Sequence, residues 1–400
     1  MDRLIATDDG WWVLRGDAVA HVPPEGVLDG ALTSQALLAL RDAGLPDQQE
    51  QAAFALTVLT ATSCNLGCSY CFQNTAAAGA ATQPTSNPFA PTRIARHLLE
   101  ERTTADIVRF VRGRMAATGF TTVRLLIFGG EPLLNPRGTI FLLKSLAELG
   151  LAGADMVTNA VLLTAPLAQK LADAGLQEVQ VTFDGSRTHH DRTRVDHRGR
   201  GTYDQILRNV QRAADASPSL HWQFRLNVSS SNVSSLDDLI DDLTQLRLSR
   251  PAEVYLALVD DVGVGYVDTL DYSSLLADRF KNLLSRAMDD GLRTPPFSNS
   301  TAGCAFCGVV GGGTGAVINA DGTLYSCWET AGKPEWRVGD VVRGYDPQAE
   351  ITSRWVSCDY DVTAHGSTVS TDAFYSDVNA FLLDRTYRPA RFATTAVGPA

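Results

Sequence analysis

The sequence lacks any apolar run of about 18 residues, so it offers no candidate for a membrane-spanning helix. Its first residues, MDRLIATDDGWW, also lack the apolar segment of a secretory signal peptide. Basic residues are fewer than acidic ones, 34 against 45, and the formal net charge is −11. Such a charge argues against nucleic acid or an anionic membrane as the main partner, although one local segment, RTHHDRTRVDHRGRGT (187–202), is basic. We therefore expect a soluble, cytoplasmic protein.

Cysteine is also scarce, with seven in 400 residues. In a reducing compartment, clustered cysteines favour metal binding or catalysis over disulfides. Three of them, Cys64, Cys68 and Cys71, fall within SCNLGCSYC. Three thiolates on one short loop can bind three corners of an iron–sulfur cubane and leave one iron open, as catalytic zinc sites keep an open position. The alternatives are a zinc site that is completed elsewhere, or unrelated buried cysteines.

From residue 54 the sequence alternates between short apolar runs and amphipathic segments. We expect strands at 54–62, 123–128, 154–159, 178–183, 221–229 and 253–259, each followed by a helix, with 74–92 as a loop insertion. Repeated strand–helix units predict an α/β fold with a parallel sheet, here a partial (β/α)6 barrel. Sites in such folds lie at the C-terminal ends of the strands, where the three cysteines fall.

The two ends of the chain depart from this pattern, and three domains are expected. Residues 1–53 indicate a small α+β unit, a β-hairpin and a helix that starts at Thr33 or Ser34 and stops at Gly44. Residues 54–290 hold the barrel. Residues 291–400, rich in glycine and turn signals, indicate a loop-rich domain that a metal could hold together.

SCNLGCSYC, with Tyr70 before its third cysteine, resembles the cluster loop of the radical S-adenosylmethionine (radical SAM) enzymes. The resemblance implies a [4Fe–4S] cluster on Cys64, Cys68 and Cys71, with S-adenosylmethionine (SAM) on the open iron. An electron donor such as flavodoxin or ferredoxin then reduces the cluster. Reduction cleaves SAM to methionine and a 5′-deoxyadenosyl radical, which abstracts hydrogen from the substrate.

Further segments resemble motifs of the same family in the same order. FGGEP resembles the GGEP motif, and VTNAVLL resembles the third-strand TNG segment with Ala160 in place of glycine. VTFDGSRTHHDRTR and FRLNVS resemble the segments of the fourth and fifth strands. The resemblance implies that Glu131 receives the SAM ammonium group. The candidate contacts to SAM or substrate are Tyr70, Gly129, Gly130, Glu131, Pro132, Asn159, Arg194, Arg225 and Asn227. Three aspartates at strand ends, Asp184, Asp260 and Asp261, are candidate bases, with capping as the alternative.

The remaining cysteines lie near the C-terminus. Fourteen residues separate Cys307 from Gly322, and four separate Gly322 from Cys327, in a stretch that also predicts a β-hairpin through Asp321-Gly322. This spacing resembles the opening of the SPASM domain, which carries auxiliary iron–sulfur clusters. Because the full cysteine array is missing, the resemblance is closer to the shorter, twitch-like version. It implies one auxiliary [4Fe–4S] cluster on Cys304, Cys307, Cys327 and Cys358; zinc is the alternative.

Radical SAM proteins with such C-terminal domains mostly modify peptides. The resemblance therefore implies a maturase that forms a carbon–carbon or thioether cross-link, or a related modification, in a ribosomally made precursor peptide. Residues 1–53 could hold a leader peptide along a strand edge, or they are a packing extension. The alternatives are a twitch-type dehydrogenase of a small molecule, formylglycine formation and, outside enzymes, a zinc-stapled binding protein.

Overall fold

The computed structural model describes residues 3–15, 18–45, 53–71, 73, 94–259, 266–296, 312–355 and 368–388. Several predicted features lie outside the described residues, namely the loop insertion at 74–92 and the side chains of Asp260, Asp261, Cys304, Cys307 and Cys358. No helix in the described ranges is both long and apolar enough to cross a membrane.

The predicted partial barrel is confirmed. Parallel strands lie side by side in chain order from β6 to β11. They are β6 (Phe54–Ala61), β7 (Val123–Gly129), β8 (Leu151–Thr158), β9 (Glu178–Phe183), β10 (His221–Val228) and β11 (Glu253–Leu258). Every residue of β6 is buried, which matches its nearly continuous apolar run and the burial of a parallel strand on both faces.

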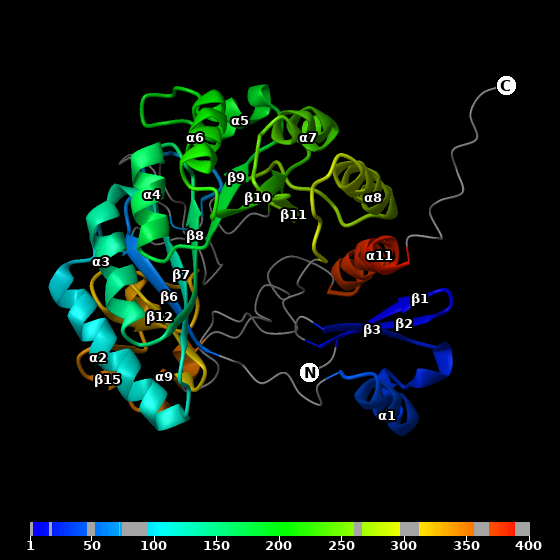
Figure 1. Ribbon diagram of the computed structural model, residues 1–400, viewed down its shortest axis with the longest axis horizontal. Helices are drawn as coiled ribbons and strands as arrows, with labels where there is room; N and C mark the ends of the chain where they lie inside the picture. The colour runs from blue at the N-terminus through cyan, green and yellow to red at the C-terminus, as the bar shows by residue number, and fades with distance from the viewer. Residues whose placement is uncertain are drawn as a thin grey trace.

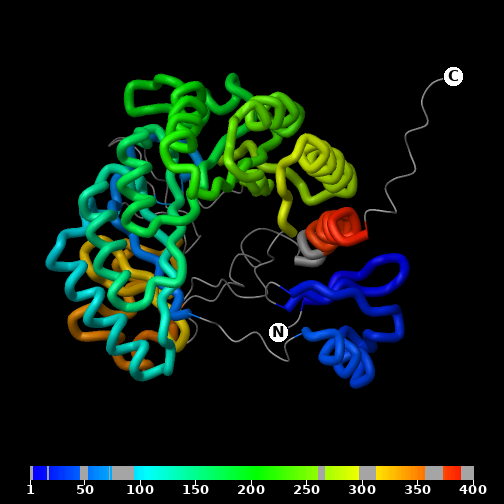
Figure 2. The backbone as a smooth tube through the Cα atoms, in the orientation of Figure 1, coloured from blue at the N-terminus to red at the C-terminus, as the bar shows by residue number. Residues whose placement is uncertain are grey.

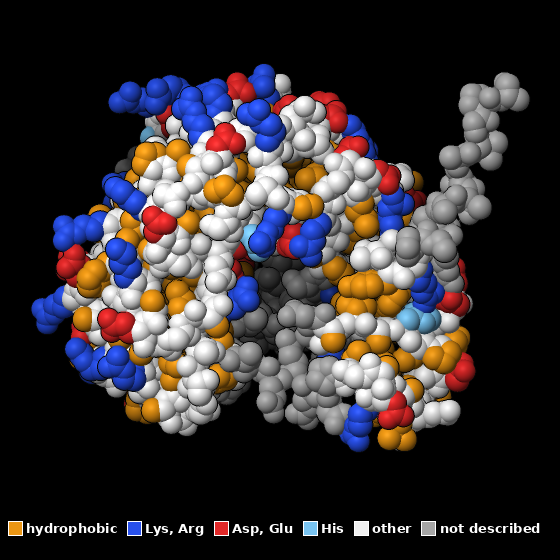
Figure 3. Space-filling view, in the orientation of Figure 1, with side chains coloured by type: hydrophobic (Ala, Val, Ile, Leu, Met, Phe, Trp, Pro, Cys, Tyr) orange, Lys and Arg blue, Asp and Glu red, His pale blue; other side chains and the backbone are white. Residues whose placement is uncertain are grey.

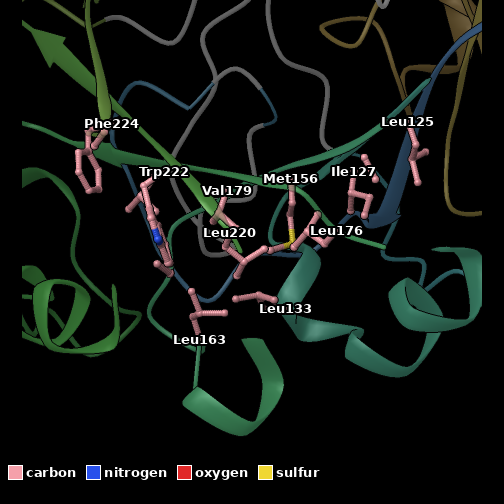
Figure 4. Close-up of a cluster of buried hydrophobic side chains, with 14 of the residues drawn as sticks. Leu125, Ile127, Leu133, Met156, Leu163, Leu176, Val179, Leu220, Trp222 and Phe224 are labelled. Atoms are coloured by element: carbon pink, nitrogen blue, oxygen red, sulfur yellow. The ribbon is translucent and has the colours of Figure 1, made fainter. Parts of the chain in front are cut away.

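Helices cover the outer face of this sheet, as Figure 1 shows. They are α2 (Glu101–Thr118), α3 (Pro136–Ala147), α4 (Ala165–Asp173), α5 (Arg187–Thr193), α6 (Tyr203–Ala216), α7 (Leu236–Thr244) and α8 (Ser274–Asp289). Figure 4 shows the apolar core in which side chains such as Met156, Val179 and Trp222 lie. Because successive strand side chains point to opposite faces, the residues between them, such as Glu178 and Gln180, line the inner face.

The C-terminal part of the chain extends the same sheet beyond β6. Strand β12 (Gly315–Ile318) pairs in parallel with β6 and then turns into the antiparallel strand β13 (Thr323–Tyr325), which confirms the predicted hairpin through Asp321-Gly322. The short strands β14 (Gly339–Asp340) and β15 (Gly344–Tyr345) and helix α9 (Gln348–Ile351) follow. The pairing of β12 with β6 was not predicted, and the proposed domain boundaries stay predictions.

The N-terminal unit is a sheet of three antiparallel strands with one helix. Its elements are β1 (Arg3–Thr7), β2 (Gly10–Arg15), β3 (Ala18–Val22), the small pair β4 (Val27–Leu28) and β5 (Ala31–Leu32), and α1 (Ser34–Asp42). The hairpin expected there is thus part of a larger sheet. Thr33 is the N-cap of α1, and its hydroxyl accepts a hydrogen bond from the backbone N–H of Ala36.

A long C-terminal helix, α11 (Thr368–Tyr387), joins this unit to the barrel, and the sequence-based interpretation had no helix there. Figure 2 shows it between the first strands and α8. The ring centroids of Phe374 and Phe280, on α11 and α8, are 5.3 Å apart. On its other side, Asp384 accepts a 2.8 Å hydrogen bond from the Trp12 indole.

Candidate functional site

The cysteine loop begins at the C-terminal end of β6, where Cys64, Cys68 and Cys71 are half-buried. Its backbone folds around the sulfur atoms: the Leu66 N–H lies 3.4 Å from Cys64 Sγ, and the Cys71 N–H donates to the Cys68 carbonyl at 3.3 Å. Burial raises the pKa of both Cys64 and Cys68, the latter to about 12. The thiolate forms of these groups therefore need a bound positive charge to stabilise them, which an iron–sulfur cluster would supply.

The GGEP turn lies directly against this loop. The Gly130 N–H donates to the Ala61 carbonyl and the Glu131 N–H to the Ser63 carbonyl, each at 2.9 Å. A Cβ on Gly130 would lie 2.5 Å from the Ser63 carbonyl oxygen, so only glycine permits this approach. Two motifs separated by 56 residues in the sequence are therefore packed as one structure.

Glu131 is fully buried and ties the GGEP turn to the end of β8. Its Oε1 accepts from the Leu133 N–H at 2.9 Å and from the Thr158 hydroxyl at 2.6 Å, and its Oε2 accepts from the Asn159 N–H at 2.8 Å. Burial raises its pKa, although these three donors favour the charged form. Because a carboxylate has about four acceptor positions, one remains for a ligand's ammonium group.

Tyr70 is the centre of a second buried group of polar residues. Its hydroxyl donates to the Asp184 carboxylate at 2.8 Å and accepts from Arg194 Nη1 and Asn227 Nδ2, each at 2.8 Å. Arg225 adds an outer contact, because its Nε donates to Asn227 Oδ1 at 2.8 Å. The structure therefore brings together residues from the cysteine loop and from the ends of β9, α5 and β10.

The Asp184 carboxylate is held within this group. Burial raises its pKa, while the nearby Arg194 guanidinium and the Tyr70 hydroxyl favour its charged form. Its closest Arg194 nitrogen, Nη1, is 3.7 Å away. The contacts give Asp184 a role in orienting Tyr70 and Arg194, and its predicted role as a base stays a prediction.

The end of β8 completes the arrangement around the cysteine loop. Asn159 Nδ2 donates to Asn65 Oδ1 at 2.9 Å and lies 3.6 Å from Cys64 Sγ. The next residue, Ala160, has a φ of 58°, in the left-handed region that glycine prefers. The backbone thus keeps the shape of a Thr-Asn-Gly turn although alanine occupies the third position.

The residues present fit a thiolate-bound cluster with a polar ligand beside it. Two buried donors, Arg194 Nε and Gln73 Nε2, have no hydrogen-bond partner among the described residues, which suits a bound acceptor group. Cysteine thiolates are the ligands that iron–sulfur clusters require. The described residues contain no group of three or more His, Cys, Asp or Glu side chains close enough together to hold a single metal ion, and this applies to iron and to zinc alike.

Two kinds of side chain line the inner face of the sheet. Near β6 and β12 the wall is apolar and aromatic: Phe128 stacks on Trp328 with ring centroids 5.6 Å apart, beside the buried Tyr325. On β10 and β11 it is polar, and the Arg225 guanidinium lies 5.9 Å from the centre of the Tyr255 ring. Cys327 is buried next to Trp328, while its three expected partner ligands lie outside the described residues.

Sequence reasoning missed several residues of this site. Tyr266 makes an edge-on contact with the Tyr70 ring, at 5.6 Å between centroids, and His197 Nε2 donates to the Cys64 carbonyl at 2.9 Å. Gln73 lies only two residues beyond the third cysteine, and this closeness was a usable signal. Tyr266 and His197 are far from the cysteines in the sequence, so no local pattern identifies them.

The fold and the site define a class: a partial α/β barrel in which a three-thiol loop packs against a Gly-Gly-Glu turn at the strand ends. Residues 58–243 match the model of the Radical SAM superfamily, the family whose motifs the cysteine loop and the GGEP turn resemble. The prediction of a SAM-binding, iron–sulfur type of protein is supported at this level.

Comparisons with individual proteins found a relative by sequence and two solved structures of similar fold. The chain is 26% identical over 232 residues to GTP 3′,8-cyclase of Moorella thermoacetica, which covers 58% of this chain and 62% of that enzyme. Its fold is similar to that of anSMEcpe with bound AdoMet, with a TM-score of 0.59 and 14% identity over 84% of this chain and 99% of the other. It is also similar to SuiB of Streptococcus suis bound to the precursor peptide SuiA, with a TM-score of 0.50 and 15% identity over 83% and 73%.

Proposed function

We propose that the chain is a radical SAM enzyme that removes hydrogen from a side chain of a ribosomally made precursor peptide and so forms a cross-link or a related modification. The observation that carries the proposal is the packing of Gly130 and Glu131 against the residues that precede Cys64. It puts a buried carboxylate and three thiols at one end of the barrel, where parallel α/β barrels bind their substrates.

In this proposal the protein's residues hold the cluster, orient SAM and shield both from solvent. Cys64, Cys68 and Cys71 would hold the cluster, and the free acceptor position of Glu131 would take the SAM ammonium group. Arg194 and Asn227 would fix Tyr70 beside the cofactor. When bound, the cluster and SAM supply a hydrogen-abstracting radical. Cys327, with Cys304, Cys307 and Cys358, would hold the auxiliary cluster.

The N-terminal sheet supports a peptide as the substrate. Within the described residues β3 (Ala18–Val22) pairs only with β2, so one edge of the sheet has no strand beside it. An extended peptide can add to such an edge through main-chain hydrogen bonds, which recruits a leader without demanding a particular side chain. The similar SuiB structure has a precursor peptide bound, which is consistent with this class of substrate.

The first experiment tests the radical chemistry. Anaerobically reconstituted protein with SAM and dithionite should form 5′-deoxyadenosine and methionine, and iron analysis should give about four irons for the loop cluster and about eight with the auxiliary one. Cys64→Ala is the control that should form neither product. A wild-type protein that binds iron but yields no 5′-deoxyadenosine would overturn the proposal.

The second experiment identifies the substrate. A precursor peptide encoded beside the gene, incubated with the loaded enzyme, should lose two hydrogens in mass for each cross-link formed. The same peptide without its leader should react more slowly if β3 recruits the leader. An unchanged mass in the presence of 5′-deoxyadenosine formation would count against a peptide substrate.

A second candidate is a small anionic substrate. It is favoured by the similarity to GTP 3′,8-cyclase, which extends over 58% of this chain. GTP supplied in place of the peptide, followed by mass spectrometry of the nucleotide fraction, separates the two candidates. Conversion of GTP without modification of the peptide would favour the second.

A further inference from the structure

A basic turn covers the cysteine loop from the outside. Residues 195–200 follow α5, and their backbone pairs with the loop: Leu66 and Asp196 form an antiparallel bridge, and the Gly67 N–H donates to the Val195 carbonyl at 2.9 Å. The exposed His197 reaches the loop as well, through the hydrogen bond of its Nε2 to the Cys64 carbonyl at 2.9 Å. The turn is therefore attached directly to the residue that is expected to bind the cluster.

The carboxylates in this region are used to hold the turn together. Asp196 accepts from the backbone N–H of Arg198 and of Arg200, at 2.8 and 2.9 Å, and from the Arg200 side chain at 2.7 Å. Asp191 accepts from the backbone N–H of Thr202 and of the next residue, at 2.7 and 2.9 Å. Local acids thus order the backbone of the turn instead of pairing with all of its arginines.

The result is an exposed positive surface on an acidic protein. Residues 187–202 contain five arginines and two aspartates, a net +3 with neutral histidines, in a chain of net charge −11. The exposed Arg192 and Arg198 form no ion pair with a described residue, while Arg200 pairs with Asp196. Figure 3 shows Lys and Arg side chains gathered at the top of the view, over α5, α6 and the loop between them.

We propose that the basic turn patch, formed by Arg192, His197, Arg198 and Arg200, is the docking surface for an acidic one-electron carrier protein of the flavodoxin or ferredoxin type. The proposal rests on the proposed function, because only a cluster on the cysteine loop needs such a carrier. With flavodoxin, the anionic flavin hydroquinone gives one electron to the cluster and becomes the neutral semiquinone. The cluster core changes from 2+ to 1+, and no atom or proton is transferred.

The position of the patch favours an electron carrier over a peptide or a nucleic acid. A carrier has to approach the cluster without entering the inner face of the barrel, where the substrate is expected. The turn provides this approach, since a single hydrogen bond separates His197 from the Cys64 backbone. The remainder of the chain is negative and repels an acidic protein. A positive patch attracts that protein locally and so raises the rate of association.

The first test measures binding with purified oxidised flavodoxin as the probe. The variant Arg192→Glu/Arg198→Glu should raise Kd about tenfold or more at about 0.1 M salt, and the difference should nearly vanish at about 1 M salt, where the Debye length is about 3 Å. The matched control is Arg102→Glu/Arg112→Glu, which makes the same charge change at exposed positions of α2 and should leave Kd within about twofold of wild type.

The second test measures electron entry by stopped-flow bleaching of the cluster absorbance. The Arg192→Glu/Arg198→Glu variant should slow reduction by flavodoxin hydroquinone about tenfold, whereas reduction by dithionite stays at the wild-type rate. The milder Arg192→Gln/Arg198→Gln variant should slow reduction by flavodoxin hydroquinone to a smaller degree. Its thermal unfolding midpoint should equal that of wild type. These controls separate a docking defect from a folding defect.

The outcomes distinguish the two proposals. Wild-type flavodoxin affinity in the Arg192→Glu/Arg198→Glu variant would overturn the docking proposal, and so would a variant that loses precursor peptide or nucleic acid and keeps flavodoxin. A failure to form 5′-deoxyadenosine with dithionite would instead overturn the proposed function. The binding measurement does not depend on that reaction, so each result has its own meaning.

Discussion

The two ends of strands β8 to β11 carry acidic residues in opposite settings. At the C-terminal ends, Asp184 is surrounded by donors and pairs with Arg194. At the N-terminal ends of β9 and β11 lie Glu178 and Glu253, and Asp155 of β8 is the register partner of Glu178. Arg124 pairs with Asp155 and Arg293 with Glu253. Burial and these two neighbouring carboxylates raise the pKa of Glu178 to about 7. One end of the strands therefore fixes charges for a site. At the other end, repulsion among carboxylates exceeds what Arg124 and Arg293 offset at Glu178, and protonation of Glu178 relieves it.

The largest effect is expected at the cysteine loop, on the C-terminal side of this comparison. Cys64→Ala, Cys68→Ala or Cys71→Ala should abolish 5′-deoxyadenosine formation and remove about four irons per chain, because three thiolates are needed to hold a cubane with one open iron. Cys327→Ala is the informative control, since it should lose only the auxiliary irons. Equal iron content in Cys68→Ala and wild type would contradict the assignment of this loop.

The next largest effect is expected from the buried ion pair. Asp184→Asn leaves the Arg194 guanidinium buried without its carboxylate, and it should lower the free energy of unfolding by about 3 to 5 kcal/mol. Urea denaturation of the unloaded protein measures this change. A loss below about 1 kcal/mol would mean that the contacts around Tyr70 contribute little, and would weaken the contrast between the two strand ends.

The acidic end should respond with the opposite sign and a smaller size. Because the pKa of Glu178 is higher in the folded chain than its ordinary value of 4.5, the folded state binds more protons, so stability falls as pH rises from about 4.5 to about 7. Glu178→Gln should therefore be more stable than wild type at about pH 8, by about 1 kcal/mol after allowance for partial exposure, and equal to it at about pH 4. Denaturation at both pH values checks it, and a variant less stable at high pH would contradict it.

The smallest effect is expected at the end of β8. Ala160→Gly removes the strain of a left-handed alanine, which costs about 1 to 2 kcal/mol of stability. It also removes a buried methyl group, whose burial contributes about 0.8 kcal/mol. The net gain in unfolding free energy should be about 0.5 kcal/mol. Ala154→Gly, in the strand itself, is the matched control and should only destabilise, so a loss of stability in both variants would count against strain at Ala160.

The barrel was predictable because its signal is local. The strands were expected at positions such as 178–183 and 221–229 and are observed at Glu178–Phe183 and His221–Val228. In both, apolar residues alternate with polar ones, which leaves a clear signature in the sequence. The cysteine loop and the GGEP turn were found in the same way, because each motif is continuous.

The remainder depended on contacts between distant segments. Gly315 pairs with Ala55, and Asp196 pairs with Leu66, through backbone contacts. Such contacts leave no periodic pattern in the sequence of either segment. Helix α11 did leave a signal, since its buried Phe374, Val378 and Leu382 are spaced four residues apart, and that spacing was overlooked. The partners of Tyr70 were named as candidates, but no motif indicates that its hydroxyl would bond to three of them at once.

The contact between Trp12 and Asp384 has a consequence for how the protein is made. The two residues are 372 positions apart, and Ile5, Trp12 and Leu383 form one buried cluster. During translation β1 and β2 leave the ribosome long before α11, and the apolar side chains on this face remain exposed until α11 emerges. The packing of these strands is thus completed only when α11 has been made, so chaperone protection should matter most for nascent chains that still lack α11.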